Sequence, residues 1–327
     1  MSNDNLMSLQ SHILAEEQQY PGATGDFSWI LSAISLSAKT IANKVRRARI
    51  DDVLGEHGES AQNVHGEQQQ KLDVLANELI MRCLGDRANV GVLASEEDEE
   101  PRLLRARGEG GRYAVLFDPL DGSSNLDFCV GVGTIFSIIK LSDEHPTDAE
   151  AAILQQGVHQ VAAGYVLYGS SVVLILTTGR GVHMFVLDQS IGSFVLVERD
   201  IKIPKSSKTY SVNEAYTDTF PPGYKQYLNW AHQEGYSSRY IGSMVADVHR
   251  TLLKGGVFLY PPTAIHPNGK LRLMYEANPM AMVIEQAGGK AINGETAICD
   301  MSPTGLHQRT SVILGSAEEV EHVQRFL

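Results

Sequence analysis

The chain has 327 residues and a formal net charge of −12 at pH 7, and 43% of its residues are hydrophobic. This length and composition are typical of a globular protein with one large or two ordinary domains and a sizeable core. The acidic balance argues against a nucleic-acid partner or an anionic-membrane partner, because both need a basic surface.

The start of the chain and its cysteines bear on the cellular compartment. Residues 1–5 lack the basic and apolar regions of a signal peptide, and no apolar run reaches the length of a membrane span. Cys83, Cys129 and Cys299 are few, far apart and without a CxxC pair. Neither a disulfide framework nor a zinc-thiolate site is therefore expected, and a reducing cytoplasm fits best.

The first part of the chain is predicted to form two helices joined by a polar loop. Apolar residues recur at helical spacing over residues 26–49, and a basic cluster suits the C-terminal end of that segment. Residues 51–69 are polar and rich in glycine, which predicts a loop of functional length. Residues 70–84 form the second predicted helix. Asp73 lies near the edge of its apolar side, where a carboxylate needs a partner or a function.

A series of strands follows, and helices alternate with strands from about residue 200. Strands are predicted at 90–94, 113–117, 132–141, 161–168, 171–178, 182–187 and 194–198, with a long polar connection at 142–160. Beyond residue 200, helices are predicted at 242–254, 278–287 and 316–326, and strands at 257–260 and 311–315. The pair Asn278-Pro279 predicts a helix start, because it supplies a capping residue followed by proline.

The most informative segment is FDPLDGSSNLD, residues 117–127. It follows the apolar run 113–117, which predicts a buried strand that ends in a turn at proline and glycine. Asp118 and Asp121 suit hard divalent cations, which prefer oxygen ligands. The following Gly-Ser-Ser turn offers backbone N–H groups and hydroxyls that commonly hold phosphate. Metal carboxylates beside a phosphate cradle indicate metal-assisted phosphoryl chemistry.

Two other groups of carboxylates lie near predicted strand ends. The run Glu96–Glu100 follows the strand at 90–94, and Glu276 comes shortly after the apolar segment that ends at Leu273. Open α/β sheets place their sites at the carboxyl ends of strands. Taken singly, an acidic run is most often a solvated loop, and Asp-Pro and Asp-Gly pairs are common in turns. The complete string DPLDGSSNLD after a strand is too specific for chance and favours function.

These motifs resemble those of the lithium-sensitive sugar phosphatases, and further blocks resemble class I fructose-1,6-bisphosphatases. The blocks are KLDVLANE (71–78), VGTIFSI (132–138), AAGYVLYG (162–169), YSVNEAY (210–216), RYIGSMVADVHRTLLKGG (239–256), GKLRLMYEANPMA (269–281) and EQAGGKA (285–291). The similarity runs from about residue 10 to the C-terminus. Inositol monophosphatases share only the metal motifs, so the resemblance is to the fructose enzyme.

The resemblance implies an α/β (α+β) fold in a layered α-β-α-β-α sandwich with two subdomains. Residues 1–198 would form an N-terminal allosteric and metal-motif domain, and residues 199–327 a C-terminal sugar-phosphate-binding domain. It also implies a homotetramer that hydrolyses the 1-phosphate of fructose 1,6-bisphosphate in gluconeogenesis, with Mg²⁺ as cofactor and Mn²⁺ or Zn²⁺ as substitutes. Two alternatives stay open: a sedoheptulose-1,7-bisphosphatase, and a non-catalytic sensor of sugar phosphate or AMP.

By the same resemblance, one metal would be held by Asp118, Asp121 and Glu276. Glu96 and the carbonyl of Leu120 would help to hold a second, and Glu97 would complete the cluster. Asp73 and Glu97 are the candidates for orienting or deprotonating the attacking water. The alternative is that Asp73 has only a structural role, as a helix carboxylate paired with Lys71 or with a backbone group. Glu67 stands where the family has a loop carboxylate that can reach the site.

The resemblance assigns substrate binding to two groups of residues. The 1-phosphate would lie against Asp121, Gly122, Ser123 and Ser124, with Arg272 as a forked partner. The 6-phosphate would lie against Asn213, Tyr216, Tyr240, Tyr260 and Lys270, and Met244 would contact the sugar. Arg239 matches a residue that reaches into a neighbouring subunit's site. As an alternative, Tyr240, Met244 and Tyr260 are ordinary core residues.

An AMP pocket is also implied, at the start of the first predicted helix. Helix N-termini bind anions well. The matching positions are Thr24, Gly25, Asp26, Phe27, Arg112, Tyr113 and Lys140. The family commonly has lysine and arginine where this chain has Arg112 and Lys140, and glutamate where it has Asp26. Arginine and lysine bind phosphate with different geometry, so AMP inhibition of this chain is a hypothesis.

Overall fold

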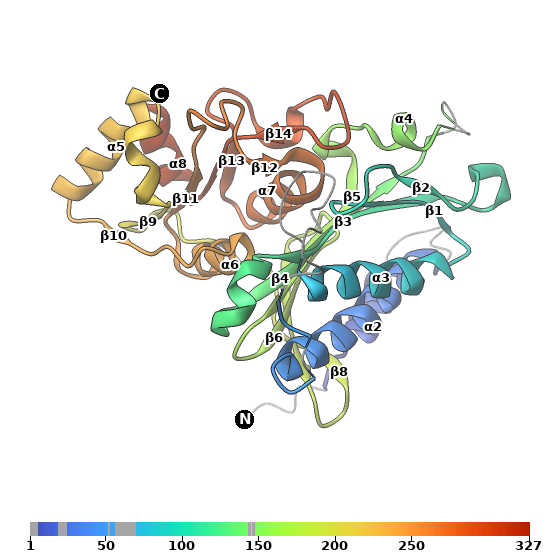
Figure 1. The fold of residues 1–327 in the computed structure, drawn as a ribbon. Coiled ribbons are helices and arrows are strands. Elements are labelled where there is room, and N and C mark those ends of the chain that lie inside the picture. The colour runs from blue at the N-terminus through green and yellow to red at the C-terminus, as the bar shows by residue number, and fades with distance from the viewer. Residues whose placement is uncertain (1–5, 19–24, 52, 56–69, 143–144, 146–147) are drawn as a thin grey trace.

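The structure, a computed structural model, describes residues 6–18, 25–51, 53–55, 70–142, 145 and 148–327, except the side chain of Asp26. Helices and sheets alternate in five layers, as the sequence predicts (Figure 1). Three hydrophobic cores fill the spaces between these layers, because one core surrounds the middle helices and contacts both sheets. A fourth core packs against the β1–β3–β4 end of the large sheet. Among the described residues, no helix is both long and apolar enough to cross a membrane.

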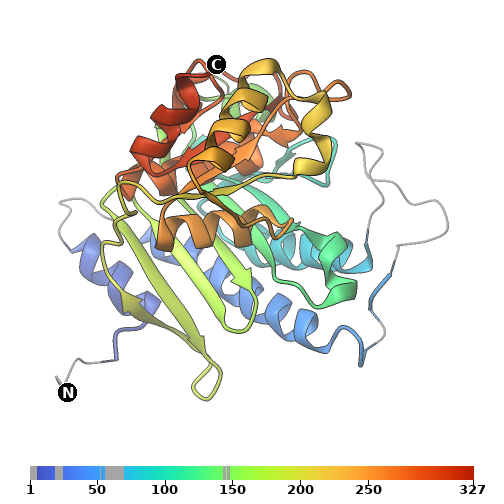
Figure 2. The same ribbon diagram turned by 90° about the vertical axis from the view of Figure 1, so that its left-hand side faces the viewer.

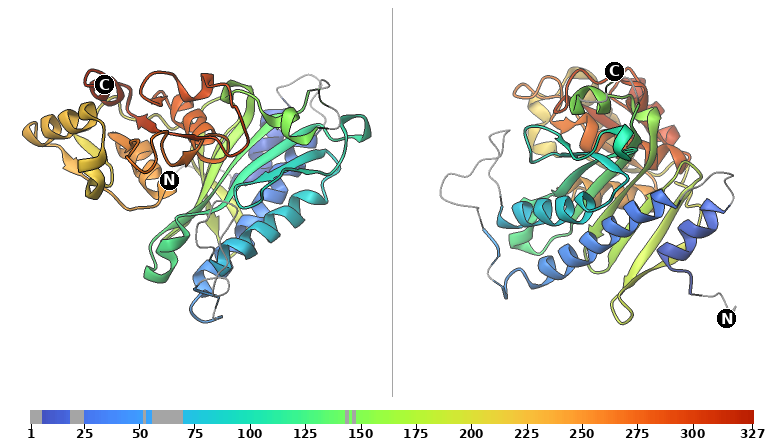
Figure 3. Two further views of the ribbon diagram at one scale, coloured as in Figure 1. Left: turned by 45° about the horizontal axis from the view of Figure 1, so that its top comes forward. Right: turned by 90° about the vertical axis from the view of Figure 1, so that its right-hand side faces the viewer.

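The first layer contains α1 (Leu9–Glu17), α2 (Asp26–Arg47) and α3 (Lys71–Gly85). These helices cover one face of the large sheet, as Figures 2 and 3 show from two sides. Ile30, Leu31, Ile34 and Ile41 recur at helical spacing on α2 and are buried against the sheet. Burial of this apolar stripe is what holds α2 in place.

The second layer is an eight-stranded sheet in the order β2-β1-β3-β4-β5-β6-β7-β8. Only the β1–β3 pair is parallel, and the other neighbours are antiparallel. The carboxyl ends of β1 and β3 therefore lie side by side, which brings two acidic motifs together. The strands are β1 (Val90–Ser95), β2 (Arg102–Leu103), β3 (Tyr113–Asp121), β4 (Val132–Lys140), β5 (Gln160–Tyr168), β6 (Val172–Thr177), β7 (Val182–Asp188) and β8 (Ser193–Glu198).

The remaining layers come from the C-terminal part of the chain. Helices α6 (Met244–Lys254) and α7 (Asn278–Gln286) lie between the two sheets and share one apolar core with both. The second sheet has the order β10-β9-β11-β15-β13, and its outer face is covered by α5 (Pro222–Gln233) and α8 (Ala317–Gln324). Its strands are β9 (Thr209–Ser211), β10 (Ser237–Ser238), β11 (Val257–Tyr260), β13 (Lys290–Ile292) and β15 (Val312–Gly315).

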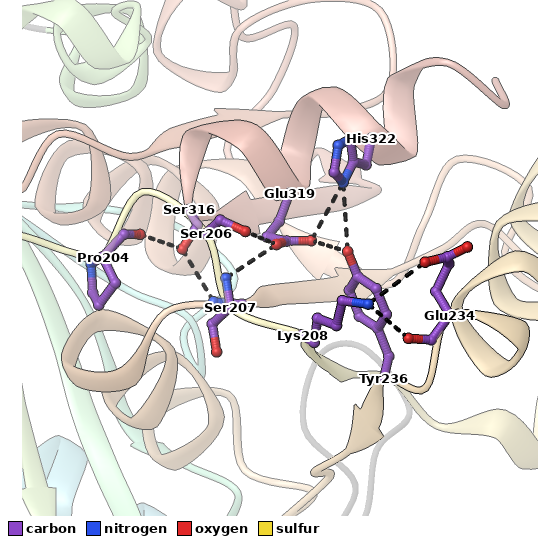
Figure 4. A network of polar contacts seen from close by, with 10 residues as sticks. Pro204, Ser206, Ser207, Lys208, Glu234, Tyr236, Ser316, Glu319 and His322 are labelled. Carbon is purple, nitrogen blue, oxygen red and sulfur yellow. Dashed lines mark hydrogen bonds and ion pairs between the residues drawn. The ribbon is translucent and has the colours of Figure 1, made fainter.

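A buried carboxylate anchors α8 to this second sheet (Figure 4). Glu319 is fully buried and accepts hydrogen bonds from Ser207 N at 3.0 Å and from Tyr236 Oη at 2.8 Å. Ser206 Oγ donates to the same carboxylate at 2.5 Å. A buried charge is tolerable when several donors satisfy it, so this network is a structural use of a glutamate.

The main predicted elements are confirmed, and three local predictions are wrong. The strand predicted at 113–117 does not end before the aspartates, since β3 continues through Asp121. The connection predicted at 142–160 contains a helix, α4 (Ala149–Ile153). The helix start predicted at Asn278-Pro279 is confirmed, since α7 begins at Asn278, but Asn278 does not cap it, because the chain is already helical at Ala277. Helices α1 and α5 were not predicted. Most of the predicted loop 51–69 and Glu67 lie outside the described residues.

Candidate active site

A cavity of about 480 Å³ lies where the ends of β1 and β3 meet the start of α6. Its walls come from both the N-terminal and C-terminal parts of the chain. All the residues predicted to bind metal or the 1-phosphate line it: Glu96, Glu97, Asp118, Leu120, Asp121, Gly122, Ser123, Ser124, Arg272 and Glu276. Tyr240, Met244, Tyr260 and Lys270, predicted to bind the rest of the substrate, line the same cavity.

Asp118, Asp121 and Glu276 form a cluster in which one oxygen from each residue lies within 4.8 Å of the others. Asp118 and Asp121 are three residues apart on β3, and in a regular strand such side chains point to opposite faces. A bulge resolves this, because Asp118 pairs with Ile135 while Asp121 pairs with Gly133. An advance of three residues along β3 is therefore paired with only two residues along β4. The extra residue turns both carboxylates to one side of the sheet. Pro119 within the bulge cannot donate to the sheet.

Glu276 reaches the cluster from a short π-helix, Leu273–Ala277, which runs directly into α7. π-Helical turns are rare and are frequent at functional sites. The strand β12 (Leu271–Arg272), paired with β14 (Arg309–Thr310), precedes this turn. The backbone N–H of Arg272 donates to Glu276 Oε2 at 2.5 Å, which orients the carboxylate.

The cluster is strongly acidic and largely buried. Burial and the nearby carboxylates Glu96, Asp121 and Glu276 hold the pKa of Asp118 well above its usual value. Burial likewise raises the pKa of Glu96, although the guanidinium of Arg272 opposes this, and burial raises the pKa of Asp121 to about 6. The Arg272 guanidinium forms an ion pair with Glu96 and lies 3.9 Å from Glu276. Crowded carboxylate oxygens fit one or more hard divalent cations, since such cations neutralise the repulsion.

Asp73 lies at the first turn of α3 and is 4% exposed. Its Oδ2 accepts a hydrogen bond from Gln70 N at 2.9 Å, and this bond and the nearby Ser123 hydroxyl hold its pKa down somewhat. Burial, with a further contribution from Glu97, raises the pKa of Asp73 to about 7. The hydrogen bond from the Gln70 backbone agrees with the alternative in which Asp73 has only a structural role. The raised pKa, caused mainly by burial, suits an acid–base role.

The predicted phosphate turn begins at Gly122, which has a φ of +75°. Ser123–Phe128 then form a 3₁₀-helix whose N-terminal end faces the cavity wall. The turn is held against the start of α6, because Asn125 Nδ2 donates to Gly242 O at 3.0 Å. A Cβ atom at Gly122 would lie 2.8 Å from Ser243 Cβ, so this position accommodates only glycine.

The residues predicted for the 6-phosphate lie around a second, smaller cavity of about 160 Å³. Asn213, Tyr216, Tyr260 and Lys270 line it, and Tyr260 and Lys270 also line the larger cavity. The two cavities are therefore adjacent. Tyr240 is 40% exposed, so it is not a core residue. Met244 is 5% exposed and serves both the core and the cavity wall.

The structure does not bring Arg239 into either cavity. Its side chain is exposed, and its guanidinium donates to the carbonyl of Ser238 at 2.9 Å. Conversely, three contributors to the site were not singled out from the sequence. Ser243 Oγ and Val245 N each donate to Asp121 Oδ2 at 3.0 Å, and His266 lines the smaller cavity. Ser243 and Val245 lie within the block 239–256, but only their contact with β3 marks them as orienting groups.

The residues predicted for AMP are partly described. Gly25 has a φ of +74° and precedes α2, and the Phe27 ring packs edge-on against Tyr113 with centroids 6.3 Å apart. Tyr113 is the direct cross-strand partner of Lys140. Arg112 is exposed next to them. Thr24 lies outside the described residues, and of Asp26 only the backbone is described.

Comparison with known proteins identifies the family. Residues 7–199 match the family model for the N-terminal domain of fructose-1-6-bisphosphatase, and residues 203–327 match the model for its C-terminal domain. The chain is 49% identical over 329 residues to a fructose-1,6-bisphosphatase class 1 of Chlorobium chlorochromatii, with 98% of each chain covered. A fructose-1,6-bisphosphatase class 1 of Chloroherpeton thalassium is also 49% identical, with 98% of this chain and 93% of the relative covered.

Solved structures agree with this result. The crystal structure of Leishmania major fructose-1,6-bisphosphatase in holo form superposes with a TM-score of 0.93 at 43% identity, covering 98% of this chain and 99% of the other. The same enzyme in its T-state gives a TM-score of 0.87 at 41% identity over the same shares. The fold, the clustered carboxylates and these similarities agree, and the chain belongs to the fructose-1,6-bisphosphatase family.

Proposed function

We propose that the chain is a metal-dependent phosphatase that hydrolyses the 1-phosphate of fructose 1,6-bisphosphate to give fructose 6-phosphate and phosphate. The observation that carries this proposal is one cavity in which the Asp118–Asp121–Glu276 cluster faces the Gly122–Ser124 turn. The adjacent smaller cavity, lined by Lys270, offers a second phosphate site at the other end of the sugar. A substrate with two phosphates suits this pair of cavities.

Mg²⁺ is the proposed cofactor, with Mn²⁺ or Zn²⁺ as substitutes. Its ligands would come from the carboxylates Glu96, Glu97, Asp118, Asp121 and Glu276 and from the carbonyl of Leu120. When bound, the cation supplies Lewis-acid stabilisation of the negative charge that moves onto the leaving oxygen. The donor set fits it, because hard cations take oxygen ligands and the buried carboxylates are otherwise opposed mainly by Arg272.

The chain's own residues bind the phosphate and move the proton. Backbone N–H groups of the Gly122–Ser124 turn and the hydroxyls of its serines bind phosphate oxygens. Asp73 takes the proton of the attacking water, and its pKa of about 7 places it near the operating pH. Ser123 belongs to this turn and lies near Asp73, so the base is proposed to act beside the bound phosphate. Glu97 is a second acceptor for the same proton.

Two regulatory proposals accompany this activity. AMP binds at the start of α2, where Phe27 packs on Tyr113 and Lys140 lies opposite that tyrosine. Its phosphate would be held by Lys140 and Arg112.

The chain assembles as a homotetramer in which the exposed Arg239 enters the site of a neighbouring subunit. We place the enzyme in the cytoplasm and its reaction in gluconeogenesis.

The direct test is phosphate release, with Mg²⁺ present, from fructose 1,6-bisphosphate, sedoheptulose 1,7-bisphosphate and inositol 1-phosphate. Release from the fructose substrate that disappears in Asp118→Ala supports the proposal. Faster release from the sedoheptulose substrate would replace it with the sedoheptulose-bisphosphatase alternative. No release from any of them, by a folded and metal-loaded protein, would favour the non-catalytic sensor.

A further inference from the structure

A second cluster of metal-ligating side chains lies away from the active site, between α1 and β7. His12 and Glu16 are four residues apart on α1 and therefore project from the same side of the helix. His183 projects toward them from the second residue of β7. One ligand atom from each of the three residues lies within 4.8 Å of the others. The two histidines are 3% and 8% exposed.

The distances inside this cluster are close to those around a small cation. Glu16 Oε1 lies 3.5 Å from His12 Nε2 and 3.8 Å from His183 Nε2. Ligands of a tetrahedral Zn²⁺ lie roughly 3.4 Å apart, given metal–ligand distances of about 2.0–2.2 Å. Small side-chain adjustments would therefore complete the geometry. The fourth position would face the partly exposed side of Glu16 and take a water molecule.

The polar atoms of the cluster are otherwise poorly satisfied. Neither His12 Nε2 nor His183 Nε2 has a hydrogen-bond partner among the residues that the structure describes. Buried imidazole nitrogens without a partner are costly and call for an explanation. Thr178 Oγ1 donates to Glu16 Oε2 at 2.9 Å, which orients the carboxylate and leaves Oε1 toward the two rings. Such an outer hydrogen bond is typical of a metal ligand.

The surroundings favour the neutral imidazoles that a metal requires. Burial lowers the pKa of both histidines, and the nearby positive charge of Arg199 lowers them further. Glu16, and for His183 also Asp200, act in the opposite direction. The N–H of Asp200 points at His183 Nδ1 over 3.3 Å, a long contact. Metal binding at Nε2 would place the ring proton on Nδ1, so this long contact with the Asp200 N–H would be given up.

We infer that His12, Glu16 and His183 form a binding site for a transition-metal cation, best matched by Zn²⁺, that ties α1 to the end of the large sheet. Two imidazoles and one carboxylate suit Zn²⁺, whereas Mg²⁺ prefers oxygen ligands alone. The two sites of the chain would thus select different metals. The site is also connected to α2, because Glu17, the residue after Glu16, accepts a hydrogen bond at Oε1 from Ser28 N at 3.3 Å.

The test counts bound Zn²⁺ per chain. The full chain is stripped with EDTA and dialysed against micromolar Zn²⁺ with a large excess of Mg²⁺, which occupies the carboxylate cluster. Wild type is expected to retain one more Zn²⁺ than His12→Gln, Glu16→Gln or His183→Gln. His232→Gln is the matched control, because His232 Nε2 lies 3.4 Å from Glu214 but this pair belongs to no three-ligand cluster in the described chain.

Two further readouts separate loss of the site from loss of the fold. Co²⁺ added to wild type should give the visible absorption of a tetrahedral imidazole site, and this absorption should be absent in His183→Gln. Mg²⁺-dependent activity and the melting temperature of the metal-free protein should be retained in the variants, while Zn²⁺ should raise the melting temperature only in wild type and His232→Gln. Equal Zn²⁺ retention by wild type and all three cluster variants overturns the inference, as does an equal loss in His232→Gln.

Discussion

Ser243 Oγ donates a hydrogen bond to Asp121 Oδ2 over 3.0 Å, and this contact joins the start of α6 to the end of β3 at the carboxylate cluster. Val245 N donates to the same oxygen at the same distance. One carboxylate of the cluster is thus oriented by backbone and side chain from the C-terminal part of the chain. Because both parts position Asp121, small changes where they meet should affect catalysis more than stability.

Gly122→Ala tests this meeting point. The new Cβ would lie 2.8 Å from Ser243 Cβ, and the residue would keep a φ of +75°. We expect kcat/KM for fructose 1,6-bisphosphate to fall about 100-fold, since a shift of the phosphate turn of about 1 Å misplaces the substrate. Gly192→Ala is the control, because its φ is +63° and nothing lies within 4 Å of the added atom. It should cost about 1–2 kcal/mol of stability and leave kcat/KM intact. Equal activity of the two variants would contradict the prediction.

Asp118→Asn should separate activity from stability. We expect kcat/KM with Mg²⁺ to fall more than about 100-fold through loss of a metal ligand. The pKa of Asp118 is raised in the folded state, so the folded carboxyl ionises less readily than the unfolded one and destabilises the protein at high pH. Asparagine removes this penalty, and the melting temperature of the EDTA-treated protein at pH 8 should rise by a few degrees.

Asp127→Asn is the matched control for that experiment, because Asp127 belongs to the same motif but is exposed. It should change neither kcat/KM nor the melting temperature. If Asp118→Asn lowered the melting temperature of the metal-free protein, the repulsion inferred for the carboxylate cluster would be wrong.

Asp73→Asn should remove the general base. We expect kcat to fall about 10²–10⁴-fold with little change in KM, because the carboxylate acts on the water and not on the sugar. In wild type, kcat should decline as the pH falls below about 7, where Asp73 becomes protonated, and this step should be missing in the variant. Glu78→Gln, an exposed change on the same helix, should retain the wild-type profile. An unchanged pH profile in Asp73→Asn would assign the step to another group.

His249 should make the protein sensitive to acid. Burial lowers the pKa of His249 to about 4, and Tyr165 Oη lies 3.0 Å from its Nδ1. Between pH 6.5 and 4 the unfolded state binds more protons than the folded state, so stability is full above pH 6.5 and is lost as the pH falls. From pH 8 to pH 5 this group should remove roughly 2 kcal/mol of unfolding free energy.

Urea unfolding at pH 8 and pH 5 checks this value. His249→Gln, which keeps a partner for Tyr165, should lose correspondingly less stability over that interval than wild type. His159→Gln, at an exposed position, should behave as wild type does. If both variants lost as much stability as wild type, the acid sensitivity would come from other groups.

The proposed AMP site predicts that inhibition by AMP depends on the cations beside Tyr113. Lys140→Ala should raise the AMP concentration for half inhibition at least about tenfold, since one charge-assisted phosphate contact is lost. kcat without AMP should not change, because Lys140 lies outside both cavities of the active site. Lys205→Ala, an exposed lysine in the C-terminal part, should leave inhibition unaltered. Wild-type activity that resists millimolar AMP would remove this proposal altogether.

Much of the fold and site could be predicted from local patterns. The apolar stripe of α2, the buried strands of the large sheet and the helices α6, α7 and α8 all have regular spacing of apolar residues. Helix α1 was missed because polar residues interrupt its short buried face, where His12 lies between Leu9 and Ile13. Helix α5 was missed because prolines, tyrosines and polar residues obscure its period.

The sequence by itself determined the family and located the carboxylates and the turn proposed to bind metal and phosphate, because those residues are contiguous in short motifs. Only the tertiary structure decided how they face one another. The bulge at Pro119 depends on the register between β3 and β4, and it turns Asp118 and Asp121 to one side. The contact of Ser243 with Asp121, and the meeting of His12 with His183, join residues more than 100 positions apart. Such contacts follow from how layers pack, and no periodicity along the chain encodes them.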